Sequence, residues 1–199
     1  TIPFQWYAIF VIEEKFGFNK QTPSLFITDK LKSWGLSIVL GGLILTAIIW
    51  IYNLTPEYFW LLAFGVVTAF SLFMSMFYSE LIVPLFNKQT PLEEGELRTA
   101  IEAFANKSGF KLKNIYMIDG SKRSTKANAY FTGLGPKKRI VLYDTLTEQM
   151  NTDEIVAVLA HEIGHYKHKH VLKGMLYSIP SSLLLFFLLG WMLGSDALA

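Results

Sequence analysis

The segment with the most recognisable chemistry is residues 161–165, which read His-Glu-Ile-Gly-His. Histidines four positions apart share one face of a helix, so the imidazoles of His161 and His165 can bind one Zn²⁺ ion. Glu162 follows the first ligand and can act as general base towards the attacking water, while zinc polarises the scissile carbonyl. The pattern predicts a zinc metalloendopeptidase; the alternative interpretation is a surface helix that carries two ordinary histidines.

This predicted zinc site is one protein ligand short. A catalytic zinc ion takes three protein ligands and keeps a fourth position open. A thermolysin-like site takes its third ligand from a glutamate on a later helix, but the only carboxylate after His165 is Asp196. We therefore expect the third ligand beyond Ala199 and the sequence to be an internal piece of a longer protein. His168 and His170 are candidate substitute ligands, but His168 lies about two turns from His161, a long reach to a common ion. We therefore interpret both as residues that complement the dipole at a helix C-terminus.

The zinc motif falls on a predicted amphipathic helix within a small α+β unit. Asn151, with Glu154 three residues later, is typical of a helix start. The apolar residues that follow at helical spacing predict a zinc-binding helix over about residues 152–170. Upstream, a helix is expected from about residue 93 to residue 108, and strands at residues 115–118, 127–132 and 140–143. Together these elements predict a catalytic unit over residues 79–173.

Residues 128–131 are a candidate substrate-binding strand. Asn128 and Ala129 begin a small-then-aromatic run on a possible edge strand. An extended peptide can add to such an edge through main-chain hydrogen bonds. Ordinary packing within a β-hairpin is the alternative for this run.

The composition indicates a membrane protein. Of 199 residues, 52% are hydrophobic and 17% charged, whereas soluble globular chains have about 45–50% and about 25%. Residues 36–52, 59–78 and 174–194 contain no charged residue, and about 20 apolar residues suffice for a helix to cross the bilayer. We expect a truncated span end and loop at 1–35, a transmembrane hairpin at 36–78 and a last span at 174–194. The predicted fold is mainly α, with multispan membrane helices and a small cytoplasmic α+β metalloprotease unit.

The distribution of charge predicts the orientation and argues against nucleic acid as a partner. All 18 Lys and Arg residues lie in 13–35 or 79–173, and none lies in 53–57 or 195–199. The positive-inside rule therefore places both basic segments in the cytoplasm.

The basic clusters at 122–126 and 137–139 are interpreted as a solvated face or as contacts with anionic headgroups. Net charge is only +2 and no stacking-aromatic motif accompanies the cations. The absence of cysteine excludes disulfides and thiolate metal sites.

The chain resembles a known family, the type I CAAX prenyl endopeptidases, which are multispan zinc metalloproteases. The resemblance runs through nearly the whole chain in the family's order. Its narrowest signature is Glu-Glu-Lys-x-Gly-Phe-Asn at residues 13–19, because the zinc motif alone is shared by many metalloproteases. The matching segments are Phe10–Asn19, Pro84–Leu92, Gly120–Phe131, Arg139–Leu146 and Val158–His165.

The resemblance implies a function and a role for each motif residue. It makes His161 and His165 zinc ligands, Glu162 the catalytic base, and Asn128 and Ala129 part of the strand that holds the substrate. It implies removal of the C-terminal tripeptide from prenylated C-a-a-X proteins, in the endoplasmic reticulum or a bacterial inner membrane. The family's third ligand is a Glu on a later helix, so the 199 residues alone are expected to be inactive. The alternatives are a membrane-protein quality-control metalloprotease and a non-catalytic membrane scaffold.

Overall fold

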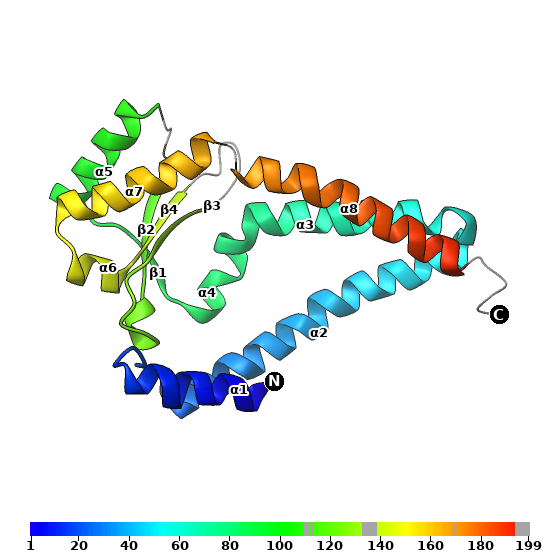
Figure 1. Ribbon diagram of the computed structural model, residues 1–199, viewed down its shortest axis with the longest axis horizontal. Coiled ribbons are helices and arrows are strands. Elements are labelled where there is room, and N and C mark those ends of the chain that lie inside the picture. The colour runs from blue at the N-terminus through cyan, green and yellow to red at the C-terminus, as the bar shows by residue number, and fades with distance from the viewer. Residues whose placement is uncertain (110–111, 113, 133–138, 169, 194–199) are drawn as a thin grey trace. The chain divides into compact units, whose positions relative to one another are not determined.

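The computed structural model describes residues 1–109, 112, 114–132, 139–168 and 170–193, with no description of the side chains of 165–167 and 170–172. The predicted basic pair Lys137–Lys138 and the predicted span end at Gly194 lie outside the described residues. The chain divides into two compact units, Thr1–Lys30 with Ser75–Lys167 and Leu31–Met74 with His168–Ala199. We call them the sheet unit and the helical unit, and each is described by itself (Figure 1).

Among the described residues, three helices are long and apolar enough to cross a membrane. They lie within Pro23–Leu54, Pro56–Leu81 and Lys173–Leu193. The corresponding elements are α2 (Pro23–Leu54), the 3₁₀ turn η2 (Pro56–Tyr58) with α3 (Phe59–Leu81), and α8 (His170–Leu193). Helix α2 begins well before residue 36, because the uncharged run used for prediction omits its polar first turns. The prediction of membrane helices is confirmed.

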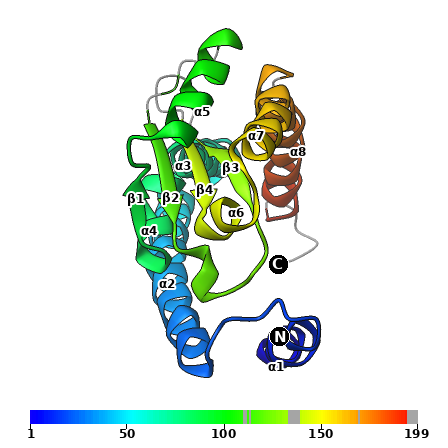
Figure 2. The same cartoon turned by 90° about the vertical axis from the view of Figure 1, so that its left-hand side faces the viewer.

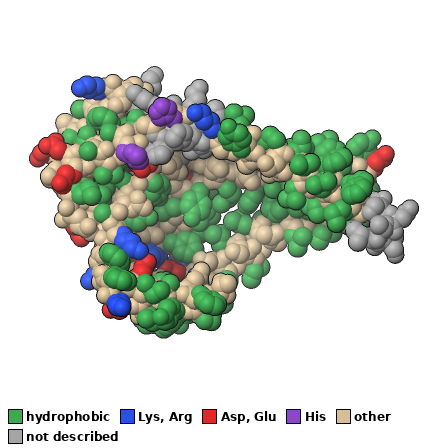
Figure 3. Space-filling model, viewed as in Figure 1, with side chains coloured by type: hydrophobic (Ala, Val, Ile, Leu, Met, Phe, Trp, Pro, Cys, Tyr) green, Lys and Arg blue, Asp and Glu red, His purple; other side chains and the backbone are tan. Residues whose placement is uncertain are grey.

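Aromatic contacts hold the helical unit together. Tyr52 meets Phe59 edge to face across the short turn between α2 and α3, with ring centroids 5.2 Å apart. Trp60 of α3 meets Phe187 of α8 in the same way at 5.4 Å. Gly190 lies directly under Trp60, where an added Cβ would be 2.7 Å from the Trp60 Cβ. Hydrophobic side chains cover much of the visible surface of this unit (Figure 3), as expected for helices that face lipid or other helices.

A four-stranded sheet organises the sheet unit, in the order β1-β2-β4-β3. β2 pairs in parallel with β4, whereas β1 pairs antiparallel with β2 and β3 antiparallel with β4. The three predicted strands are confirmed, and β1 is an additional short edge strand that the sequence analysis missed because it ends in proline. The strands are β1 (Gln89–Pro91), β2 (Asn114–Ile118), β3 (Ala129–Thr132) and β4 (Arg139–Tyr143).

One face of this sheet is covered by α5 (Glu96–Lys107), α6 (Asp144–Gln149) and α7 (Thr152–Lys167). Figure 2 shows these helices beside the strands. Ile101 from α5, Leu146 from α6 and Leu159 from α7 are almost fully buried against the strand residues Ile140 and Leu142. Burial of one fully enclosed aliphatic side chain stabilises the fold by about 1.5–3 kcal/mol, so this cluster fixes α7 on the sheet.

The remaining short elements lie before and between the strands. α1 (Ile2–Tyr7) continues into the π-helical segment η1 (Ala8–Glu13). α4 (Val83–Phe86) follows α3, and the 3₁₀ turn η3 (Gly120–Lys122) follows β2. α7 ends at Lys167 and α8 begins at His170. The sequence predicts a zinc-binding helix that ends at about residue 170, whereas α7 ends at Lys167. The prediction runs past this end because α8 resumes the helical periodicity at His170.

Candidate active site

The start of α7 is fixed by a capping box. The Asn151 Oδ1 accepts a hydrogen bond from the Glu154 backbone N–H at 3.0 Å, and the Glu154 Oε2 accepts one from the Asn151 backbone N–H at 2.9 Å. These two bonds satisfy amide groups that the first helical turn leaves without intrahelical partners. The predicted helix start is therefore confirmed, and it sets the rotational phase of the helix that carries the His-Glu-x-x-His motif.

The phase of α7 turns His161 away from the hydrophobic core. Ile155, Leu159 and Ile163 repeat every four residues and are buried. At about 100° per residue, His161 lies on the opposite side of the helix and is exposed, whereas Glu162 lies at the boundary and is half-buried. His165 follows His161 by four residues on the same unbroken helix, so both belong to one face. The His165 side chain itself lies outside the described residues.

The residue types of the His-Glu-x-x-His motif on α7 fit a zinc ion. Two imidazoles on successive turns and an adjacent carboxylate are the ligand and base types that zinc hydrolysis needs. Among the described residues, no three His, Cys, Asp or Glu side chains gather as a metal cluster. The predicted ligands His161 and His165 are two of the three that a catalytic zinc ion takes, and the described residues of α7 leave room for this role.

Strand β3 lies at an edge of the sheet and presents one side of its backbone away from β4. The Tyr143 N–H of β4 donates to the Asn128 carbonyl at 3.0 Å, so Asn128 and Tyr143 form a hydrogen-bonded pair. Such pairs alternate along an antiparallel ladder, so Ala129 directs its N–H and C=O groups away from β4. The Asn128 Oδ1 accepts a hydrogen bond from this Ala129 N–H at 2.9 Å. The predicted edge strand is therefore confirmed.

The zinc-motif helix and the edge strand are in contact. α7 packs against β3. Phe131 of β3 joins the cluster formed by Ile163 of α7 and Ala105 of α5. The fold thus brings the two predicted parts of the site, which are about 30 residues apart in sequence, onto neighbouring elements.

The second face of the sheet is anchored by the end of α3. Glu80 forms an ion pair with Arg139 at the start of β4, and the Arg139 guanidinium lies 4.9 Å from the centre of the Tyr116 ring. Burial raises the pKa of the Tyr130 hydroxyl above its ordinary value of 10.0, and neighbouring Ser79 and Arg139 oppose this shift. Burial also raises the pKa of Tyr143. No role for Glu80 could be predicted from the sequence, because its partner lies 59 residues away.

Sequence reasoning also missed the residues that hold the segment before β3. Lys126 forms an ion pair with Glu13 at 2.7 Å, and Arg123 forms one with Asp29 at 2.8 Å. The family resemblance identifies residues 13–19 as a narrow signature, but it does not say which residues they contact. Only the concentration of charge in two segments pointed to such pairs, and charge alone does not specify which residues meet.

A zinc-motif helix packed on the edge strand of a small sheet, in a chain with three possible membrane helices, defines a class: the membrane-integral metallopeptidases. Family comparison agrees with this class. Residues 91–198 match peptidase family M48, and residues 1–88 match the family described as CAAX prenyl protease N-terminal, five membrane helices. The chain belongs to peptidase family M48.

The similar proteins described next are named as CAAX prenyl protease 1, as its homolog or as Ste24p. CAAX prenyl protease 1 of Saccharomyces cerevisiae is 47% identical over 189 residues, which are 94% of this chain and 42% of that protein. The Homo sapiens CAAX prenyl protease 1 homolog is 34% identical over 234 residues, covering 99% of this chain and 49% of that protein. The crystal structure of S. mikatae Ste24p matches with a TM-score of 0.89 and 46% identity, covering 95% of this chain and 44% of that one. The chain spans less than half the length of these relatives.

Proposed function

We propose that the full-length protein is a zinc-dependent membrane endopeptidase that removes the C-terminal tripeptide from prenylated C-a-a-X proteins. The observation that carries this proposal is the His-Glu-x-x-His helix packed beside the edge strand β3. The substrate class is carried over from relatives named CAAX prenyl protease 1, which match nearly the whole chain.

In this proposal His161 and His165 hold zinc and Glu162 is the catalytic base. Zinc, when bound, supplies Lewis acidity to the hydrolysis of the scissile amide. Glu162 takes a proton from the attacking water and passes it to the leaving amine. Its half-buried position beside the exposed histidine face keeps the carboxylate next to the ligands and away from the core.

The substrate peptide binds in an extended conformation along the outer edge of β3. Main-chain hydrogen bonds to a strand edge fix a peptide without reading its sequence, which suits an enzyme that cuts variable tripeptides. The Asn128 side chain already bonds the Ala129 N–H. On substrate binding the Ala129 N–H leaves the Asn128 side chain and donates to the peptide instead. The side-chain amide of Asn128 then becomes available to bind the peptide as well.

The catalytic unit faces the cytoplasm in this proposal. Every Lys and Arg lies in the two segments 13–35 and 79–173, which matches the excess of cations expected on the cytoplasmic side. A cysteine introduced at Glu102, in a full-length protein with any other cysteines replaced, should react with a membrane-impermeant maleimide only from the cytoplasmic side. Reaction from the opposite side contradicts this orientation.

Metal content and activity test the site. The full-length protein should contain one zinc ion, and His161→Ala should lose it. Glu162→Gln should keep the metal and lower kcat by about 10²–10⁴-fold, because it removes only the proton acceptor. A well-folded protein without metal favours the scaffold alternative. Residues 1–199 alone should be inactive, and activity there that Glu162→Gln abolishes contradicts the ligand count.

Substrate comparison tests the proposed specificity. The full-length protein should cleave a farnesylated C-a-a-X peptide and leave the same peptide without the prenyl group largely intact. Equal cleavage of both, together with cleavage of unfolded membrane proteins, favours the quality-control alternative. Loss of cleavage in Glu162→Gln is the control that assigns the activity to this site.

A further inference from the structure

The signature loop at residues 13–21 docks on the segment that leads into β3. Gly17 has φ +72°, and the N–H groups of Gly17 and Phe18 donate to the carbonyls of Glu14 and Glu13 at 3.0 and 2.8 Å. This is the Schellman pattern that ends a helix, and it requires a left-handed residue, for which glycine is best suited. The Asn19 side chain then bonds the Glu14 carboxylate and the Gln21 N–H.

The docked loop forms a short antiparallel bridge. Asn19 pairs with Ser124. On either side of this pair, the Lys20 N–H donates to the Arg123 carbonyl at 3.1 Å and the Thr125 N–H donates to the Phe18 carbonyl at 3.0 Å. The loop is therefore held by main-chain hydrogen bonds as well as by side chains.

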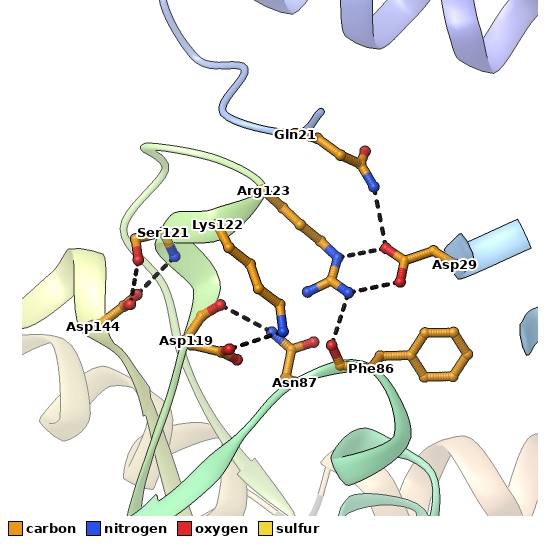
Figure 4. Close-up of polar contacts among 9 residues, drawn as sticks. All are labelled: Gln21, Asp29, Phe86, Asn87, Asp119, Ser121, Lys122, Arg123 and Asp144. Atoms are coloured by element: carbon orange, nitrogen blue, oxygen red, sulfur yellow. Dashed lines mark hydrogen bonds and ion pairs between the residues drawn. The ribbon is translucent and has the colours of Figure 1, made fainter. Parts of the chain in front are cut away.

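Arg123 is the centre of the polar contacts that secure this bridge (Figure 4). Its Nε and Nη2 donate to the two carboxylate oxygens of Asp29 at 2.8 and 2.9 Å, and Nη2 also donates to the Phe86 carbonyl at 2.8 Å. The Gln21 Nε2 donates to the same carboxylate at 3.1 Å. The side chains of Arg123 and Asp29 are only 22% and 15% exposed, so this bidentate pair is stronger than a surface salt bridge.

The segment fixed in this way continues directly into the candidate substrate strand. The Gln149 Nε2 donates to the Thr125 carbonyl at 2.6 Å, and the Thr145 Oγ1 donates to the Lys126 carbonyl at 3.0 Å. Asn128 follows two residues later and is already paired with β4. The loop before the first described membrane helix thus holds one side of this segment, and α6 holds the other.

We propose that residues 13–21, together with the positioning residues Asp29 and Arg123, hold the edge of β3 ready for substrate. This proposal rests on the proposed function, because it assumes that a peptide binds along β3. A strand edge that is ordered before binding avoids an ordering cost that the peptide would otherwise have to offset. Loosening the loop should therefore weaken peptide binding and leave the hydrolytic step largely unchanged.

The experiment replaces Asp29 in the full-length protein and measures kinetics, metal content and hydrogen exchange. Asp29→Asn keeps the shape of the side chain and removes the negative charge that faces Arg123. We expect KM for the farnesylated peptide to rise about tenfold, with kcat changed less than about twofold and zinc content unchanged. Arg123→Lys, which keeps the charge without the bidentate geometry, should give a smaller rise. The matched control is Glu102→Gln, which removes one of the two carboxylates that pair with Arg98 on α5 and should leave KM unchanged.

Hydrogen exchange separates a positioning role from general destabilisation. In Asp29→Asn the Thr125 amide should exchange about tenfold faster, whereas the β2 amides should exchange at their original rates. Equal acceleration in both places, or an unchanged KM with unchanged exchange at Thr125, overturns the proposal. If Asp29→Asn does not fold, Asn19→Ala tests the same loop without touching the ion pair. A protein with no peptidase activity refutes the proposed function, and exchange at Thr125 still tests whether the loop holds this segment.

Discussion

Glu80→Gln should destabilise the sheet unit by removing the partner of a nearly buried cation. The side chains of Arg139 and Glu80 are only 12% and 25% exposed, and they pair across the sheet face opposite α7. In the variant, the guanidinium keeps its contact with the Tyr116 ring but loses its counter-charge. Arg139 begins β4, which pairs with both β2 and β3, so the loss acts on the centre of the sheet.

The expected cost follows from this partial burial. Removing one partner of a fully buried ion pair costs about 3–5 kcal/mol, whereas an exposed pair contributes about 1 kcal/mol or less. Because solvent reaches a quarter of Glu80 and the stacking on Tyr116 remains, we expect about 2 kcal/mol. Arg139→Met should cost less, about 1 kcal/mol, since the carboxylate left behind is closer to water and the aliphatic stem still packs.

Thermal unfolding in detergent, followed by tryptophan fluorescence at one scan rate, measures these costs. At about 2–4 °C per kcal/mol, Glu80→Gln should lower Tm by about 4–8 °C. The double variant with Arg139→Met should be less destabilised than the two single effects added together, with a coupling of about 1 kcal/mol. Additive effects, or no fall in Tm for Glu80→Gln, would refute the reasoning that the pair acts as a unit.

Three further expectations concern packing and pH. Leu159→Ala should cost about 3 kcal/mol in unfolding experiments, because the side chain is 1% exposed within the core; a cost below about 1 kcal/mol contradicts the core assignment. Gly190→Ala should cost about 1–3 kcal/mol and shift the Trp60 emission, since the new Cβ would lie 2.7 Å from the Trp60 Cβ; unchanged emission and stability contradict the close approach. Burial raises the pKa of Tyr130 and Tyr143 above 10.0, so the unfolded chain loses these protons first and the free energy of unfolding falls as pH rises above about 10. Replacing both tyrosines by Phe should flatten that fall in an alkaline unfolding series, and an unchanged slope counts against their burial.

Much of the candidate site was predictable because its signals are local. The spacing of His161 and His165, the capping pair Asn151 and Glu154, and the apolar repeat of α7 all lie within one helix, where a fixed period relates position to direction. The strands with β-branched residues were predictable for the same reason. Short elements with weak patterns were not: β1 has three residues, one of them proline, and the break between α7 and α8 interrupts a periodicity that continues on both sides.

The sequence by itself determined the chemistry of the motif, the membrane helices and the family resemblance, because each depends on residue type and spacing along one segment. Only the tertiary structure decided which segments meet. It placed β3 at the edge of the sheet beside α7, paired Glu80 with Arg139, and joined Asp29 to Arg123 across 94 residues. Such contacts depend on how the chain folds back on itself, and many pairings of opposite charges satisfy the same composition. For this reason the zinc-binding motif could be recognised from the sequence, whereas the docking of residues 13–21 on the segment before β3 could not.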